Sequence, residues 1–231
     1  MYGQGVLPPD LTSAVLLIDK PKRWSSFDVV RQLRRMLPVR KIGHAGTLDP
    51  MATGLLICLV GRATRRMEAF MHLPKTYEGV MQLGAMTPSY DAETPVSRYA
   101  DWRHLSADDI RRAKQRFVGT IQQQPPMYSA VKVKGERLYK KARRGEFIER
   151  RHNTVHVYEF SITGWDGADV AFTVRCSKGT YIRALVHDMG QVLGVGAHLT
   201  RLRRTAIGEY HVRDAWAVHV LADALDTQQA S

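Results

Sequence analysis

The chain has 231 residues, 44% of them hydrophobic, and carries a formal net charge of +12 at pH 7. This composition supports an ordinary packed core in one large or two small domains. Its longest uncharged apolar stretch, residues 51–60, is too short to cross a bilayer, which argues against a membrane-spanning protein. The positive charge indicates an anionic partner, with nucleic acid as the first expectation, although such charge can also serve solubility alone.

Cys58 and Cys176 are the only cysteines, and both lie in apolar, strand-like runs. Buried, reduced thiols are therefore expected in preference to a disulfide. No Cys and His spacing resembles a zinc site, and the N-terminus lacks the basic and apolar regions of a signal peptide. We expect a cytoplasmic protein that needs no metal.

The first sixty residues predict a strand, a helix and a second strand. The run AVLLID at 14–19 is typical of a buried strand. Residues 25–37 predict a helix that Ser25 caps and Pro38 ends. The side of this helix opposite its apolar stripe carries Arg31, Arg34 and Arg35. A glycine-rich loop leads into a second buried strand at 55–60.

The remaining elements alternate between helical and strand spacing. Helices are predicted at 62–73, at 106–119 with Ser106 as its cap, from 182 to 193, and at 214–225. Strands are predicted at 76–84, 154–163 and 170–176, with a loop at 86–95, a basic stretch at 121–151 and a basic hook at 198–210.

This mixture of strands and helices, joined by both short and long connections, predicts an α/β (α+β) fold. We expect a mixed, largely antiparallel central sheet flanked by helices. No composition shift, repeat or low-complexity linker marks a seam, so residues 1–231 are expected to form a single domain.

The loop KIGHAGTLDPMATG, residues 41–54, is the first candidate site. Asp49 precedes a proline, which favours an extended backbone, and the loop continues into a buried strand. A loop aspartate most often caps a turn, but one anchored on a rigid strand, with His44 close by, can also do chemistry. The glycines do not form a phosphate cradle, because the GxxxxGK[ST] and GxGxxG patterns are absent.

The second candidate site is the turn CSKGTY, which leads into the helix containing Arg183. Free backbone N–H groups at such a turn favour anions, and Tyr181 and Arg183 extend from the same edge. Arg183 could equally be a solvated helical arginine. Tyr77 could be an ordinary core aromatic, and Lys20 a surface lysine.

These segments resemble the TruB-type tRNA pseudouridine synthases. The similarity is carried by KIGHAGTLDPMATGLL and CSKGTYIRALVHDMG, and by LLIDKPKRWSSFDVV, KTYEGVMQLG, QQQPPMYSAVKVKGERLYKKARRG and LTRLRRTAIGEY. It extends from about residue 14 to about residue 215 in one order and without large gaps. The resemblance implies the pseudouridine synthase fold and isomerisation of uridine 55 in the tRNA T loop, with no metal and no organic cofactor.

The resemblance also assigns roles to single residues. Asp49 matches the nucleophilic aspartate of the family, and Tyr77 the tyrosine that stacks on the target base and is implicated in removing the C5 proton. Arg183 matches the arginine that pairs with the aspartate. Lys20 matches a lysine that lines the pocket, and His44 the histidine that replaces the flipped base.

The basic residues are expected to contact RNA. The stretch 130–151 is similar to the family's insertion that closes over the RNA, and a second basic segment lies at 201–204. Substrate contacts are expected from Tyr181, Lys132, Lys140, Lys141, Arg143, Arg144, Arg203 and Arg204.

The chemistry required of Asp49 is attack by an ionised carboxylate, either at C1′ or at C6 of the uridine, and the sequence does not choose between them. The chain stops about twenty residues after RRTAIGEY, so the small C-terminal RNA-binding domain of many family members is expected to be absent or vestigial. The expected partner is the tRNA T arm, bound by a monomer without a protein partner.

Two rival functions remain open on the sequence. One is an RNA-binding or RNA-folding protein whose effect on the T arm matters more than its chemistry, which the net charge of +12 favours. The other is a guide-RNA-dependent relative acting on ribosomal RNA. That reading is disfavoured because such chains usually carry the extra RNA-binding domain.

Overall fold

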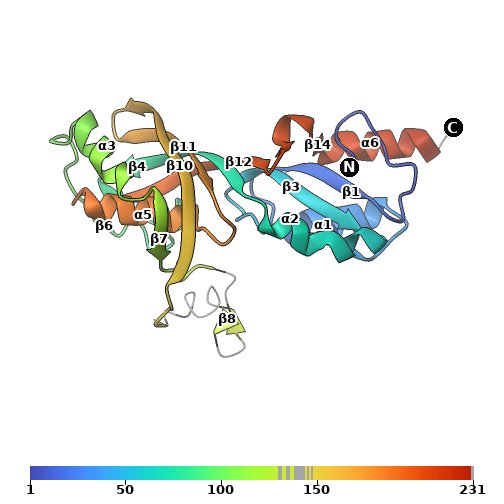
Figure 1. Ribbon diagram of the computed structural model, residues 1–231, viewed down its shortest axis with the longest axis horizontal. Coiled ribbons are helices and arrows are strands. Elements are labelled where there is room, and N and C mark those ends of the chain that lie inside the picture. The colour runs from blue at the N-terminus through green and yellow to red at the C-terminus, as the bar shows by residue number, and fades with distance from the viewer. Residues whose placement is uncertain (130–131, 134–135, 138–143, 145, 147, 230–231) are drawn as a thin grey trace. The chain divides into compact units, whose positions relative to one another are not determined.

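The computed structural model describes the whole chain except residues 130–131, 134–135, 138–143, 145, 147 and 230–231 (Figure 1). The chain divides into two compact units. Unit 1 comprises Met1–Tyr77 and Leu202–Ser231, and unit 2 comprises Glu78–Arg201. Within the described part of the chain, none of the helices has the length and hydrophobicity of a membrane-spanning segment.

Most described strands join one hydrogen-bonded sheet. Its path is β14 (Trp216–Ala217), β1 (Val15–Lys20), β3 (Thr53–Val60), β12 (Ala197–Ile207), β4 (Lys75–Leu83), β11 (Asp169–Cys176), β10 (Asn153–Asp166) and β7 (Gly119–Gln123). Off this path, β2 (Ile42–His44) pairs with β3, and β13 (Tyr210–His211) with β12. The β1–β14 and β3–β12 pairs are parallel, whereas β1–β3, β2–β3, β10–β11, β7–β10 and β12–β13 are antiparallel. The expected mixed, largely antiparallel sheet with flanking helices is thus confirmed.

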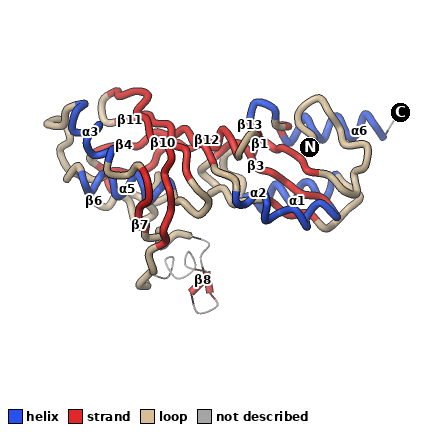
Figure 2. The backbone as a smooth tube through the Cα atoms, viewed as in Figure 1, coloured by secondary structure: helices blue, strands red, loops and turns tan. Residues whose placement is uncertain are grey.

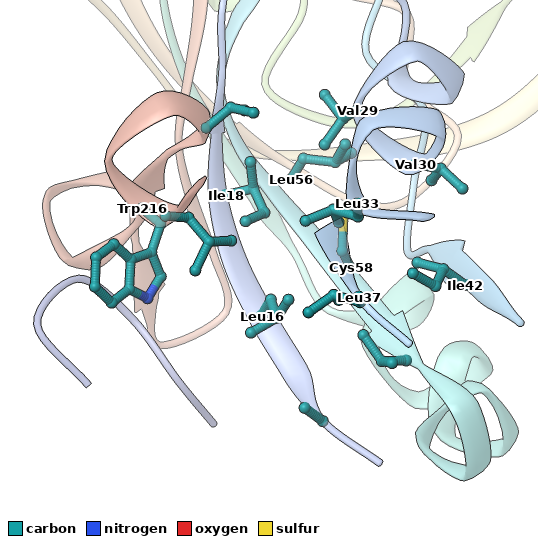
Figure 3. Close-up of a cluster of buried hydrophobic side chains, with 14 of the residues drawn as sticks. Leu16, Ile18, Val29, Val30, Leu33, Leu37, Ile42, Leu56, Cys58 and Trp216 are labelled. Atoms are coloured by element: carbon teal, nitrogen blue, oxygen red, sulfur yellow. The ribbon is translucent and has the colours of Figure 1, made fainter. Parts of the chain in front are cut away.

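Unit 1 is built on the buried strands β1 and β3, whose side chains alternate between two hydrophobic clusters. On one face, residues such as Leu16, Ile18 and Leu56 pack with α1 (Ser26–Met36) and α6 (Val218–Gln229) (Figure 3). On the other face, Leu55 and Ile57 pack with the 3₁₀ helix η1 (Gly61–Arg66) and with α2 (Met67–His72). Because both faces of the sheet are covered at β1 and β3, the sequences of these strands are nearly continuous runs of apolar residues.

Helix α1 begins and ends where its sequence signals predict. The Ser25 side chain accepts a hydrogen bond from the Asp28 N–H, and the Asp28 carboxylate accepts one from the Ser25 N–H, which completes a capping box. Val29, Val30 and Leu33 face the sheet (Figure 3). Leu37 adopts an extended conformation before Pro38, because a residue that precedes proline avoids helical geometry.

Unit 2 contains the long β10–β11 hairpin together with α3 (Ala107–Gln115) and α5 (Ile182–Val192) (Figure 2). Phe160 of β10 and Phe172 of β11 pack edge to face, with ring centroids 5.7 Å apart. The unit also has two short strand pairs: β5 (Ala85–Met86) with β6 (Arg98–Tyr99), and β8 (Lys132–Val133) with β9 (Glu136–Arg137).

Several predicted elements differ in detail. The helix expected at 62–73 is divided into η1 and α2, and the one expected at 106–119 ends at Gln115. The last helix occupies 218–229 instead of 214–225, because residues 216–217 pair with β1 as β14. Cys58 and Cys176 are both buried and are not in a disulfide, as expected.

The largest difference concerns residues 198–210, expected as a basic hook. Most of this segment is the strand β12, in which Leu202, Arg204 and Ala206 are buried while Arg201 and Arg203 are not. The alternation is that of a strand, but a buried arginine occupies one of its inward positions, so the apolar pattern is hidden in the sequence.

Asp188 in α5 makes the stability of the fold depend on pH. Burial raises the pKa of its carboxyl to about 6, well above the ordinary value for aspartate, against an opposing effect of the His152 charge. The folded protein therefore holds this proton up to about pH 6, whereas the unfolded chain releases it near pH 4. The stabilisation from the neutral carboxyl is fully present below pH 4 and is lost as pH rises through 6.

Asp188→Asn removes this titration. We expect the variant to melt a few degrees above the wild type at pH 7.5 and to lose most of that advantage at pH 4.5. Thermal melting at the two pH values, with the exposed Asp101→Asn as a control, measures the effect. An Asp188→Asn advantage that does not change with pH would contradict it.

Candidate active site

Asp49 lies in the loop between β2 and β3 of unit 1 and is half-buried. The residues on either side of it are fixed by hydrogen bonds. The Leu48 N–H donates to Ser26 Oγ (2.8 Å), and the Ser26 hydroxyl donates to the Leu48 carbonyl (3.2 Å). The Pro50 carbonyl accepts from the Arg23 N–H (2.8 Å). The aspartate is therefore presented from a loop whose backbone is tied to the start of α1.

Arg204 holds the rest of this loop. Its side chain is 1% exposed, and the guanidinium donates to the carbonyl oxygens of Leu55 (2.7 Å), Gly46 (3.1 Å) and Thr47 (3.5 Å). Close packing requires glycine at position 54, where φ is +106° and an added Cβ would lie 2.3 Å from the Arg204 carbonyl oxygen. Arg204 was expected to contact phosphate, but a buried guanidinium bonded to three carbonyls favours a role in holding the Asp49 loop.

Replacing Arg204 with methionine should leave these carbonyls without their donor inside the unit. Because each unsatisfied buried group costs about 1–3 kcal/mol, we expect the free energy of unfolding to fall by roughly 3 kcal/mol or more. Urea denaturation measures the change. The control is Arg203→Met on the same strand, where the side chain is 40% exposed and paired with Asp19, and a loss below about 1 kcal/mol is expected. Equal losses in the two variants would contradict the loop-holding role.

Lys20 is a second buried cation beside the loop. Its ammonium donates to the carbonyls of Trp24 (2.5 Å), Pro21 (3.0 Å) and Pro50 (3.5 Å), and its side chain is fully buried. Lys20 thus links the segment before α1 to the residue that follows Asp49. Its expected place in the substrate pocket stays a prediction.

Lys20 also borders a cleft of about 610 Å³ on unit 1, together with Trp24, Thr53 and Arg203. The Arg203 guanidinium makes a two-pronged ion pair with Asp19 (2.7 and 3.1 Å). Part of the Arg203 charge is therefore used within the unit, and a phosphate contact by this residue stays a prediction.

His44 in β2 is half-buried, and its Nδ1 is buried without a hydrogen-bond partner among the described residues. Burial and the Arg204 charge lower the pKa of the imidazole, against an opposing hydrogen bond with the Gly46 backbone. The ring is therefore mainly neutral at pH 7. Tyr77, in β4, is 8% exposed and is the last residue of the first segment of unit 1.

In unit 2, Arg183 occupies the first turn of α5 and is buried, with 3% exposure. Its guanidinium donates to the carbonyls of Ser89 (2.9 Å) and Tyr128 (2.8 Å), and its Nε lies 3.4 Å from Asp91 Oδ2. These contacts fix the plane of the guanidinium. The alternative reading of Arg183 as a solvated helical arginine is wrong.

Asp91 is a residue that the sequence reasoning missed. It is fully buried, and its Oδ1 accepts hydrogen bonds from the Ser89 hydroxyl (2.5 Å) and the Glu93 N–H (3.0 Å), which leaves Oδ2 facing Arg183. The segment containing it was interpreted only as a loop. Its density of hydroxyl residues around one acid, TPSYDAET, is the signal that could have indicated a buried carboxylate.

The start of α5 is fixed by Gln123, whose amide pairs with the backbone of Tyr181. The Tyr181 N–H donates to Gln123 Oε1 (2.7 Å), and Gln123 Nε2 donates to the Tyr181 carbonyl (3.0 Å). This pairing replaces a side-chain N-cap and positions the turn that leads to Arg183. The Tyr181 side chain is half-buried, and its substrate contact stays a prediction.

Most of the basic insertion lies outside the described residues, including Lys140, Lys141 and Arg143. Lys132 belongs to β8, but its side chain is not described. Arg144 is exposed, and its Nε donates to Glu146 (2.6 Å). The expected RNA contacts of this segment stay predictions.

Each unit thus brings together its own part of the predicted set. Unit 1 places Lys20, His44 and Asp49 in or beside one loop that hydrogen bonds hold in place. Unit 2 places Arg183 and Tyr181 at the start of α5. No group of three or more His, Cys, Asp or Glu residues within the described part of the chain has a metal-binding arrangement.

Two family models match the chain. Residues 34–182 match the model "TruB family pseudouridylate synthase (N terminal domain)", and residues 183–231 match "tRNA pseudouridylate synthase B C-terminal domain". The second match covers α5 from its second residue onward, all of β12 and all of α6. The expected single-domain organisation, with the C-terminal RNA-binding domain absent or vestigial, stays a prediction.

Curated relatives named tRNA pseudouridine synthase B match nearly the whole chain. The protein from Phocaeicola vulgatus is 44% identical over 221 residues, covering 93% of this chain and 94% of the relative. The protein from Opitutus terrae is 46% identical over 210 residues, covering 91% of this chain and 87% of the relative.

Among solved structures, a Cbf5–Nop10–Gar1 complex aligns with a TM-score of 0.74 at 32% identity, over 96% of this chain and 58% of that one. An H/ACA RNP bound to a substrate RNA containing 2′-deoxyuridine aligns with a TM-score of 0.72 at 29% identity, over 95% and 55%. The chain spans a little over half the length of these two solved chains.

Proposed function

The chain belongs to the TruB family of pseudouridylate synthases and is a tRNA pseudouridine synthase, and from this premise we propose that it converts uridine 55 of the tRNA T loop to pseudouridine. The observation that carries the proposal is the fixed Asp49 loop. Ser26, Arg23 and Arg204 hold its backbone, which supports a role in which the carboxylate is presented in a defined place.

The proposed reaction begins with nucleophilic attack by Asp49, at C1′ or at C6 of the uridine. The N1–C1′ bond breaks while the uracil remains in the site. The base then turns, a C5–C1′ bond forms, and the bond to Asp49 breaks so that the carboxylate is released. Loss of the C5 proton and protonation of N1 complete the isomerisation, so no atom is gained or lost overall.

Arg183 is proposed as the cationic partner of Asp49. A positive charge beside a carboxylate favours its ionised form and orients it for attack. Contacts with Ser89, Tyr128 and Asp91 suit Arg183 to this role, because they fix the guanidinium before substrate binds. Tyr77 is proposed to stack on the uracil, with its phenolic oxygen near C5.

The target base must leave its stack, which costs a few kcal/mol. His44 is proposed to fill the space that the base vacates. Its lowered pKa supports this role, because a neutral imidazole can stack among bases without the cost of desolvating a charge.

The partner in this proposal is the tRNA T arm, bound in the cytoplasm by a monomer without a protein partner or cofactor. The basic segment 130–151, Arg203 and the side chains of Lys20 and Tyr181 are proposed to contact the substrate. Attraction between lysine or arginine and phosphate weakens as salt concentration rises, so binding should be strongly salt-dependent.

Chemical mapping of pseudouridine tests the proposed function directly. Unmodified total tRNA is incubated with the pure protein and nothing else, and modified positions are read at single-nucleotide resolution. We expect modification at position 55 and at no other uridine of the T arm. Modification at a different position, or dependence on an added RNA, would refute the assignment of uridine 55.

A further inference from the structure

The outer side of α1 is a basic surface that the proposed mechanism does not use. Val29, Val30 and Leu33 of this helix face the sheet (Figure 3), so positions 27, 31 and 34, spaced by four and three residues, lie on the opposite side. We call this surface the arginine face of α1. It comprises Phe27, Arg31, Arg34 and Arg35 of the helix and Arg40 and Lys41 just after it, and all six are exposed.

Little of this charge is neutralised within the protein. Between residues 27 and 41 the single acid is Asp28, which pairs with Arg31 (2.6 Å). Among the described residues, the side chains of Arg35, Arg40 and Lys41 form no ion pair or hydrogen bond. Their charges have no structural use inside unit 1, and they face solvent.

An exposed aromatic ring lies within the same surface. Phe27 is 57% exposed, and the Arg34 guanidinium carbon is 5.7 Å from the centre of its ring. Arg34 also donates to the Ile42 carbonyl (3.1 Å), so its orientation is fixed from two sides. Cations that surround an exposed ring are typical of surfaces that bind nucleic acid.

The arginine face is connected to the Asp49 loop through two contacts of α1. At the start of the helix, Ser26 exchanges two hydrogen bonds with Leu48. Near its end, Arg34 bonds to Ile42 of β2, the strand that leads into the loop. A polyanion bound to the arginine face would therefore be held in a fixed register with Asp49.

We propose that the arginine face of α1 binds the phosphate backbone of the tRNA that carries the target uridine, as a contact separate from the basic segment 130–151. This inference rests on the proposed function, because it takes the RNA bound by the arginine face to be the tRNA substrate of the enzyme. The positive charge of the arginine face fits this partner, since one RNA strand presents a negative charge at every nucleotide.

Removing charge from the arginine face tests the proposal. The variant Arg35→Gln/Arg40→Gln/Lys41→Gln changes three side chains without ion pairs among the described residues, so the fold should be preserved, which thermal melting checks. Affinity for unmodified tRNA transcript is measured by filter binding from about 50 to 200 mM salt. We expect the dissociation constant to rise roughly tenfold near 0.1 M salt and the slope of log K against log salt to shrink by about 2 to 3.

The matched control removes the same charge elsewhere, as Arg98→Gln/Arg103→Gln/Arg213→Gln, from exposed positions outside this face. We expect its affinity and salt slope to stay near the wild-type values. If the first variant binds tRNA as the wild type does, or if both variants weaken binding equally, the proposal is overturned. The measurement reads affinity and not turnover, so its result is independent of the role proposed for Asp49.

Discussion

Asp49→Asn should abolish isomerisation, with turnover falling by roughly 10⁴-fold or more and the tRNA dissociation constant changing by less than about threefold. The reason is chemical, because an amide has nearly the shape of the carboxylate but cannot attack C1′ or C6 as a nucleophile. The loop should keep its conformation, because Ser26, Arg23 and Arg204 hold its backbone through hydrogen bonds that this substitution leaves in place.

Release of tritium from tRNA labelled at C5 of uridine measures this turnover. The matched control is Asp10→Asn, which makes the same change at an exposed aspartate of unit 1 and should retain full activity. Tritium release by Asp49→Asn at the wild-type rate would reject Asp49 as the nucleophile. A variant that lost turnover but kept every cellular effect of the wild type would favour the RNA-folding alternative.

The elements that the sequence predicted well are those determined by local signals. Helix α1 has a capping box at Ser25 and Asp28 and a proline after its last turn, and these act whatever surrounds the helix. Strands β1 and β3 are buried on both faces, so their apolar residues run without interruption. In these cases local preference and tertiary environment agree.

The features that were missed depend on contacts between distant residues. Arg204 reaches Gly46 and Leu55 across about 150 positions of sequence, and Asp91 faces Arg183 from another part of the chain. A local pattern can at most suggest that one of these groups is buried, and it does not name the distant partner. In a sequence, an arginine that donates to buried carbonyls cannot be distinguished from one that binds phosphate.

Buried cations explain why the net charge of +12 overstates the charge available to RNA. Among the described residues, five lysine or arginine side chains are buried, and each donates to backbone carbonyls. They are Lys20, Lys75, Arg150, Arg183 and Arg204. The RNA contact predicted for Arg204 therefore requires a side chain that the fold already uses, whereas the arginine face of α1 is open to solvent.

Arg183→Lys is expected to have the second largest effect, lowering turnover by about 10²- to 10³-fold while tRNA affinity changes by less than about threefold. Lysine keeps the charge but not the planar fork, so it cannot bond to the Ser89 and Tyr128 carbonyls and face Asp91 in the same geometry. A cation that is no longer fixed would stabilise the attacking carboxylate less well.

Single-turnover kinetics and direct tRNA binding separate the two quantities. Asp91→Asn is the positioning variant for the same site, because it keeps the size of the side chain and removes the charge facing Arg183. We expect a smaller loss of turnover, about 10- to 100-fold, since the carbonyl contacts of Arg183 remain. The half-buried Arg175→Lys in the same unit serves as the control and should turn over normally. Equal losses of affinity and turnover in Arg183→Lys would show that Arg183 binds RNA in general, and would remove it from the proposed place beside Asp49.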